Sequence, residues 1–242
     1  MRRARARSGL TRRALSQRCG VSERYLAQLE AGAGNISILL IRRVASALGA
    51  DLNELIGPPV DPGRRGRIAL TGLRGAGKST LGAQLAQCLA VPFIELRSEI
   101  EQELGVPLEA VFSLHGKDVY RDGERRALLR IVGQHERCVL ATGGSMVLEP
   151  QTSQMLRSRC LTVWLRATPE EHLNRVLAQG GAMPVLEREH AMVQVRTVLS
   201  ERERLYAQAD VTVDTSGLDG AQSLAQLLAA VQDLTGQPVI AP

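Results

Sequence analysis

Residues 72–80 read Gly72-Leu73-Arg74-Gly75-Ala76-Gly77-Lys78-Ser79-Thr80, which is the phosphate-loop pattern G-x-x-x-x-G-K-[ST]. An apolar run from Ile68 to Thr71 precedes it, and a helical pattern of leucines follows. The backbone N–H groups of such a loop converge on phosphate oxygens, its lysine adds a mobile charge, and Ser79 can ligate Mg²⁺. A chance glycine-rich turn is the alternative. The motif and its context predict phosphate contacts from Gly72, Gly75, Ala76, Gly77, Lys78, Ser79 and Thr80.

Apolar, β-rich runs at 67–71, 138–142 and 161–165 alternate with longer helical stretches. This alternation predicts an α/β domain, a parallel sheet covered by helices. Upstream, the segment 56–66 holds three prolines and three glycines between two regions of apolar periodicity, which is typical of a linker. We therefore expect an N-terminal domain over 1–57, a linker over 58–66 and a second domain over 67–242.

The charge of the chain is uneven. Residues 1–67 hold 13 Arg, no Lys and 5 acidic residues, whereas the remainder holds 17 basic and 20 acidic residues. Six aromatic residues are too few for a platform that stacks single-stranded bases. No apolar run approaches the ~20 residues of a membrane span, and four widely spaced cysteines without a CxxC pair disfavour zinc and disulfides. We expect a cytoplasmic protein without a membrane partner.

The basic N-terminal segment has the pattern of two helices joined by a tight turn. Leu15 and Cys19 can share an inward face, Gly20 permits a positive φ in the turn, and Ser22 can cap the second helix. This segment resembles the helix-turn-helix domains of phage repressors, and the resemblance extends to about Leu55. Their first helix would here be only residues 2–7, which suggests that the true start lies further upstream.

The resemblance implies an all-α domain whose second helix enters the major groove of operator DNA. A generic helical bundle with an arginine-rich solvated face is the alternative, and Arg24 and Gln28 are as readily solvent-exposed side chains as base contacts. We expect a homodimer on a pseudo-palindromic double-stranded operator. The predicted DNA-binding residues are Gln17, Ser22, Glu23, Arg24 and Gln28.

From Ile68 to about Thr215 the chain resembles shikimate kinases, small P-loop enzymes that phosphorylate a hydroxyl of a cyclic carboxylic acid. The resemblance implies a five-stranded parallel sheet with helices on both faces and a mobile lid. It rests on 73–82, 92–96, Ile100-Glu101, Val111-Phe112, Gly116, Tyr120-Arg121, 141–144, Arg202, Leu205-Tyr206 and Ala209-Asp210.

Departures from the kinase pattern fall in the acceptor pocket. The family's D-x-D pair is Glu95-Leu96-Arg97 here, and a guanidinium can neither accept a hydrogen bond nor take a proton. The family's Gly-Glu is Gly116-Lys117, its triple glycine ends in Ser145, and its lid arginine is Met183. Losing one charge-stabilising arginine can cost phosphoryl transfer ~10³ in rate. We therefore expect no firm catalytic residue; Lys78 and Glu95 would serve in an active kinase, with Ser79 and Glu95 holding Mg²⁺.

Arg121 and Arg202 match the arginines that bind the substrate carboxylate in the family, although each could instead form a structural ion pair. His115, His135, His172 and His190 share no ligand spacing and are interpreted as surface or helix-cap residues. The predicted effector pocket consists of Arg97, Lys117, Arg121, Gly143, Gly144, Ser145, Met183 and Arg202.

The order of the two domains resembles that of benzoyl-CoA-responsive regulators of aerobic benzoate degradation. The resemblance implies a repressor of aromatic catabolism genes, relieved by benzoyl-CoA or a related acyl-CoA, with no required cofactor and with ATP and Mg²⁺ as further ligands. Two alternatives remain: an active shikimate or related small-molecule kinase with an appended DNA-binding domain, and a regulator that senses ATP alone.

Overall fold

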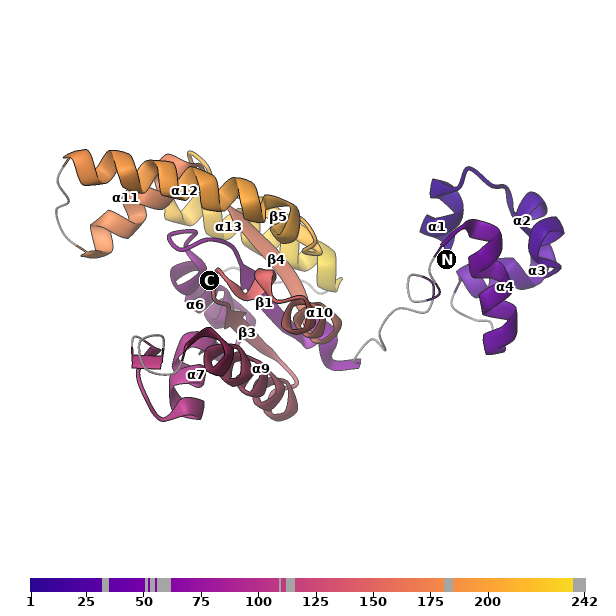
Figure 1. Cartoon of the computed structure of the whole chain (residues 1–242), viewed down its shortest axis with the longest axis horizontal. Coiled ribbons are helices and arrows are strands. Elements are labelled where there is room, and N and C mark those ends of the chain that lie inside the picture. The colour runs from indigo at the N-terminus through magenta and orange to yellow at the C-terminus, as the bar shows by residue number, and fades with distance from the viewer. Residues whose placement is uncertain are drawn as a thin grey trace. The chain divides into compact units, whose positions relative to one another are not determined.

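The computed structural model describes residues 1–31, 35–50, 52, 55, 62–108, 110–111, 116–180 and 185–236. The chain forms two compact units, Met1–Val60 and Asp61–Pro242 (Figure 1). No helix within the described residues is both long and apolar enough to cross a membrane.

Within the described residues, four short helices of the N-terminal unit have both ends defined, and side-chain caps set the starts of three of them. Thr11, Ser22 and Ser37 each accept a backbone N–H from the first turn of the helix that follows. Gly20 ends the second helix in the left-handed region at φ +65°, as the sequence predicts. The helices are α1 (Arg2–Arg7), α2 (Arg12–Cys19), α3 (Glu23–Glu30) and α4 (Ile38–Leu48). They enclose a core of Ala4, Leu15, Cys19, Val21, Leu26, Val44 and Leu48.

The C-terminal unit is built on a five-stranded sheet in which every neighbouring pair of strands is parallel, in the order β2-β3-β1-β4-β5. The strands are β1 (Arg67–Thr71), β2 (Phe93–Glu95), β3 (Cys138–Ala141), β4 (Leu161–Arg166) and β5 (Val211–Asp214). β1 is buried along its whole length because it lies at the centre of the sheet with helices on both faces. The predicted α/β class and the five-stranded sheet are confirmed.

Successive residues of the central strands pack on opposite faces. Ala69 of β1 joins a core with α7, α9 and α10, while Ile68 and Leu70 join a core with α6 and α13. The helices and 3-10 turns are η1 (Pro62–Gly66), α6 (Lys78–Leu89), α7 (Leu96–Leu104), α9 (Gly116–Gln134), η2 (Met146–Leu148), α10 (Pro150–Arg159), α11 (Pro169–Gly180), α12 (Val185–Tyr206) and α13 (Gly220–Thr235). Figure 1 shows α11 and α12 side by side over the β4–β5 side of the sheet.

Part of the predicted linker is ordered structure of the C-terminal unit. Residues 62–66 form η1, and Arg64 donates to both carboxylate oxygens of Asp210 and to the carbonyl of Arg157. These partners are too distant in sequence for local composition to reveal them. The remaining linker residues, 58–61, lie outside the described part of the chain.

Candidate functional site

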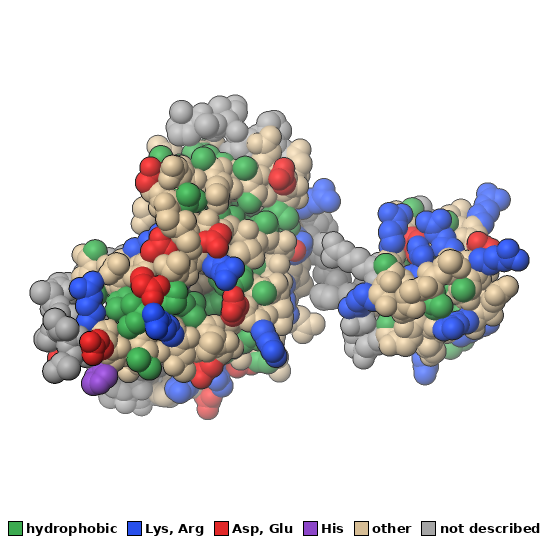
Figure 2. Space-filling view, turned by 90° about the horizontal axis from the view of Figure 1, so that it is seen from above, with side chains coloured by type: hydrophobic (Ala, Val, Ile, Leu, Met, Phe, Trp, Pro, Cys, Tyr) green, Lys and Arg blue, Asp and Glu red, His purple; other side chains and the backbone are tan. Residues whose placement is uncertain are grey.

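The predicted DNA-binding residues occupy the helix-turn-helix as expected. Ser22 caps α3, Glu23 and Arg24 stand in its first turn, and Gln28 follows one turn later. All four side chains are exposed, as is Gln17 on α2. Lys and Arg side chains outnumber acidic ones on the face of this unit seen in Figure 2. The unit is therefore a helix-turn-helix with a basic surface, and base contact by Arg24 and Gln28 stays a prediction.

A buried carboxylate joins three helices of this unit. The Glu30 side chain is fully buried, and its oxygens lie 2.6 Å from Arg5 Nε and 2.9 Å from Arg12 Nε. The hydrogen bond from Arg5, followed by that from Arg12, lowers the pKa of Glu30 to about 2 despite burial. This cluster fixes α1 and α2 against the C-terminal end of α3.

Glycines in the phosphate loop are required by its geometry. Gly72 and Gly75 have φ values of +137° and +81°. A Cβ on Gly72 would lie 2.6 Å from the Leu165 carbonyl oxygen, and one on Gly75 would lie 2.6 Å from the His172 carbonyl oxygen. Any side chain at either position would displace backbone as well as strain φ.

Lys78 faces the loop backbone. Its Nζ donates to the carbonyl oxygens of Gly72, at 2.8 Å, and Leu73, at 3.0 Å. Burial lowers the pKa of Lys78 to about 8, against the opposing effect of the Glu95 carboxylate. An anion at the loop would offset this burial cost and keep the ammonium charged.

Two residues of α11, His172 and Arg175, contact backbone carbonyls of the phosphate loop. His172 Nδ1 lies 3.0 Å from the Arg74 carbonyl oxygen, and burial lowers the pKa of its imidazole. Arg175 Nη1 donates to the Gly75 carbonyl at 3.5 Å and to Thr215 Oγ1 at 3.4 Å. The interpretation of His172 as a surface or cap residue is wrong, because its side chain is buried against the loop.

The loop opens into a cavity of about 700 Å³. Its lining includes Lys78, Ser79 and Thr80 of the loop, Arg97 at the start of α7, and the segment Gly143-Gly144-Ser145 after β3. This volume falls in the range of small-molecule sites. Glu95 is the only acidic residue among the described residues that line it. The cavity thus combines residues of the phosphate loop with a further cation, Arg97.

A neighbouring cavity of about 250 Å³ shares Tyr120 and Ser145 with the first. It is lined by Lys117 and by two of the predicted ligand-binding arginines, Arg121 and Arg202. All the predicted effector residues except Met183 thus line one of two adjoining cavities. Met183 lies outside the described residues.

The arginines of the two cavities differ in their partners. Arg97 Nε lies 3.3 Å from Glu101, and Arg121 Nε lies 3.4 Å from Glu149, so both form ion pairs within the protein. Arg202 donates from Nη1 to the Gly144 carbonyl at 3.0 Å. Its Nε is buried and has no hydrogen-bond partner among the described residues. Such a donor is costly to leave unpaired, which favours a ligand acceptor here.

Two further residues of this site were not predicted as ligand contacts. Glu124 is 1% exposed, and burial raises its pKa to about 7. Tyr120 donates to Glu124 Oε1 at 3.1 Å, one turn away on α9. The i, i+4 spacing of Tyr120 and Glu124 indicates in the sequence that the two side chains can meet on one face of a helix. The burial of the Glu124 carboxyl depends on tertiary packing and has no such signal.

The predicted Mg²⁺ ligands come from the phosphate loop and from the end of β2. Ser79 and Glu95, the predicted Mg²⁺ ligands, line the same cavity. Among the residues that the structure describes, no group of three His, Cys, Asp or Glu side chains could hold a metal ion. The four cysteines are free thiols.

Comparison with known families separates the same two parts of the chain. A shikimate kinase family model matches residues 74–232, and a helix-turn-helix model matches residues 1–55. A shikimate kinase from Nitrobacter winogradskyi is 39% identical over 146 residues, covering 60% of this chain and 67% of that protein. One from Francisella tularensis subsp. novicida is 39% identical over 155 residues, covering 64% and 88%.

Solved structures show the same architecture. Shikimate kinase from Bacteroides thetaiotaomicron superposes with a TM-score of 0.62 at 27% identity, covering 71% of this chain and 98% of that one. Shikimate kinase from Acinetobacter baumannii in complex with shikimate gives 0.60 at 28% identity, covering 71% and 94%.

Proposed function

Since the chain belongs to the shikimate kinase family and carries a helix-turn-helix domain before it, we propose that it is a DNA-binding transcription regulator whose kinase-like domain senses a small molecule. The effector is an acyl-CoA such as benzoyl-CoA, and the regulated genes serve aromatic acid breakdown. The protein acts as a homodimeric repressor that the effector releases from its operator. ATP and Mg²⁺ are further ligands of the loop.

The observation that carries this proposal is the set of charged residues that line the 700 Å³ cavity. Its phosphate end keeps Lys78 and Ser79, which suits the phosphates of coenzyme A. At position 97 it has an arginine where kinases of the family carry an aspartate, and a guanidinium cannot accept a hydrogen bond from a substrate hydroxyl. A ligand with phosphates at one end and few hydroxyls at the other fits this distribution better than shikimate does.

Coupling to DNA follows from differential affinity. An effector shifts the protein between DNA-binding arrangements only if it binds one of them more tightly. The symmetric half-sites of an operator give a small helix-turn-helix useful affinity when two copies bind together. We therefore place the effector in the kinase-like domain and the response in the spacing of the two DNA-binding units.

The alternative kinase activity has one observation in its favour: Lys78, Ser79 and Glu95 line one cavity. Calorimetry of the full chain with benzoyl-CoA, ATP and shikimate, run beside a coupled assay for ADP, separates the possibilities. We expect benzoyl-CoA to bind and ADP release to be independent of shikimate. Shikimate-dependent ADP release would refute the regulator, and ATP binding without acyl-CoA binding would favour an ATP sensor.

Variants test the placement of the effector. Lys78→Ala should weaken benzoyl-CoA binding at least about tenfold, because it removes the mobile charge at the phosphates. Arg202→Ala tests the neighbouring 250 Å³ cavity, where the unpaired Nε lies, and should also weaken binding. Arg204→Ala, an exposed arginine on the same helix, is the matched control. An unchanged dissociation constant in Lys78→Ala would exclude the phosphate loop as the effector site.

A further inference from the structure

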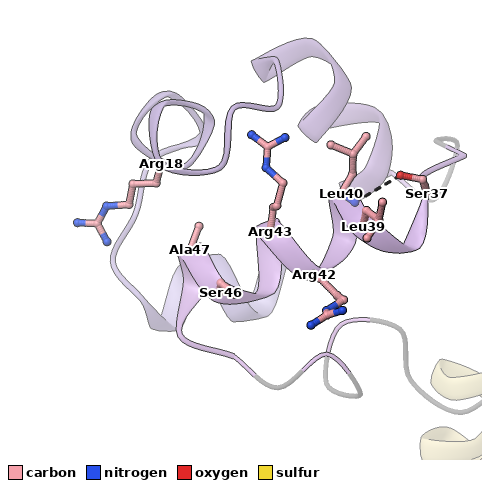
Figure 3. Close-up of a pocket in the computed structure, with 8 residues that line it drawn as sticks. All are labelled: Arg18, Ser37, Leu39, Leu40, Arg42, Arg43, Ser46 and Ala47. Atoms are coloured by element: carbon pink, nitrogen blue, oxygen red, sulfur yellow. Dashed lines mark hydrogen bonds between the residues drawn. The ribbon is translucent and has the colours of Figure 1, made fainter.

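A groove on the N-terminal unit lies outside the residues predicted to bind DNA. It runs along α4, has a volume of about 960 Å³ and is open to solvent (Figure 3). Its lining residues are Arg18, Ser37, Leu39, Leu40, Arg42, Arg43, Ser46 and Ala47. Leu39, Arg43 and Ala47 recur at i, i+4 and i+8, so one stripe of α4 forms its floor.

The apolar part of this groove is exposed to an unusual degree. Leu39 is 68% exposed, and Ile38 beside it is 64% exposed. These two are the most exposed large apolar side chains in the described part of the N-terminal unit. Both stand in the first turn of α4; Leu39 lines the groove, and Ile38 is its neighbour in sequence. Adjacent exposed apolar side chains of this size mark contact surfaces more often than isolated ones do.

The cationic part consists of three arginines, Arg18, Arg42 and Arg43. Within the described residues, none of them has an acidic partner, in contrast with Arg5 and Arg12, which pair with Glu30. Arg43 extends from α4 toward the turn between α2 and α3, where its guanidinium lies against Gly20. The groove therefore combines exposed apolar side chains at the start of α4 with three arginines that have no acidic partner among the described residues.

A second copy of this unit is a poor occupant. Residues 1–60 hold ten arginines against four acidic residues, and the arginine cluster already neutralises one of these, Glu30. A symmetric contact would oppose the arginines of one copy to those of the other, which is unfavourable. DNA phosphates would satisfy the arginines but gain nothing from Ile38 and Leu39. On α2, Arg18 also points about 100° away from Gln17, the residue expected to face the DNA backbone.

We propose that this groove docks an acidic, amphipathic segment of a partner polypeptide. Carboxylates of the partner pair with Arg18, Arg42 and Arg43, and its apolar side chains cover Ile38 and Leu39. From Leu39 to Ala47 the groove follows about 12 Å of helix, which accommodates about two turns of a partner helix. The contact leaves the start of α3 free, so the regulator could hold operator DNA and this partner together.

The test uses the full chain and a fluorescein-labelled 12-residue peptide of Glu and Leu at helical spacing. A peptide with Lys in place of Glu is the control ligand, and anisotropy measures binding. We expect saturable binding of the Glu peptide and no binding of the Lys peptide. Arg42→Glu and Arg43→Glu should each weaken it at least about tenfold, and the double change Ile38→Ser with Leu39→Ser at least about fivefold. Arg13→Glu, an exposed arginine on α2 outside the groove, should leave it unchanged.

Thermal melting of each variant controls for folding. Absence of Glu-peptide binding by the wild-type chain would overturn the proposal, as would equal effects of Arg13→Glu and Arg42→Glu. If Arg42→Glu instead weakens retention on duplex DNA while the serine variant has no effect, the groove is a DNA-backbone contact. If the serine variant converts a dimer to a monomer in sedimentation, the groove is a self-association surface, and the proposal fails.

Discussion

Replacing Glu30 by Gln should destabilise the N-terminal unit alone. The carboxylate is fully buried between Arg5 and Arg12, and its pKa falls from 4.5 to about 2. That shift corresponds to about 3.4 kcal/mol of stabilisation of the charged form. Arg12 is 42% exposed, so solvent screens part of it, and we take about 2 kcal/mol as the loss.

For a unit of about 60 residues, 1 kcal/mol moves the melting temperature by roughly 4–8 °C, so Glu30→Gln should lower it by about 10 °C. Calorimetry gives the transition of the N-terminal unit, and Trp164, which belongs to the other unit, serves as an internal fluorescence reference. Glu23→Gln, an exposed acid on the same helix, is the matched control and should cost no more than about 0.5 kcal/mol.

The pH dependence has a defined sign. Because the folded pKa of Glu30 lies below its ordinary value, its stabilisation is complete above about pH 4.5 and is lost as the pH falls toward about 2. The wild-type unit should therefore lose stability over this window, and Glu30→Gln should show a shallower decline. Equal melting temperatures for Glu30→Gln and Glu23→Gln, or the same acid profile for the variant and the wild type, would refute a buried ionic cluster.

Three further predictions concern the phosphate loop. Gly75→Ala places a Cβ 2.6 Å from the His172 carbonyl oxygen at a φ of +81°, so ATP binding measured by calorimetry should fall at least about tenfold; binding within twofold of wild type would contradict the geometry. His172→Leu should weaken ATP binding, and His172→Asn, which keeps a donor near the Nδ1 position, should restore most of it; equal loss in both would mean that packing and not the hydrogen bond to Arg74 matters. Since burial lowers the pKa of Lys78 to about 8, deprotonation should weaken ATP binding by up to about tenfold between pH 7 and pH 9, and Lys78→Arg, whose guanidinium stays charged, should bind with a flat profile; a wild-type profile as flat as that of the variant would show that the bound lysine does not titrate in this range.

Helix caps, turn glycines and the phosphate loop could be predicted from the sequence, because each depends on a few neighbouring residues. Ser22 as a cap, Gly20 as a left-handed turn residue and the glycines of the phosphate loop all depend on a few neighbouring residues. The strand before the loop was likewise visible, since a central parallel strand is an unbroken apolar run. These features are enough to define both domains and the fold of the second.

Features that depend on distant partners were missed. Arg64 was assigned to the linker because its composition is that of a linker, yet its partner Asp210 lies 146 residues away. No ligand spacing surrounds His172 in the sequence, and its hydrogen-bond partner is a carbonyl 98 residues earlier in the chain. Only packing brings such groups together, and a buried polar side chain without a local motif has no signature in sequence.

Contacts of α11 and of α12 with the pocket suggest how a bound ligand could change the position of these two helices. At the start of α11, His172 and Arg175 contact the carbonyls of the phosphate loop. Near the end of α12, Arg202 and Tyr206 donate to the Gly144 carbonyl, at 3.0 and 2.6 Å. The two helices pack against each other, so a ligand that spans the phosphate loop and the Gly144 segment acts on this helix pair at two points. A ligand that fills only the phosphate end touches one point. On the proposed function, this difference is what would let a long acyl-CoA bias the regulator where ATP alone does not, because only a ligand with different contacts in the two states can shift their populations.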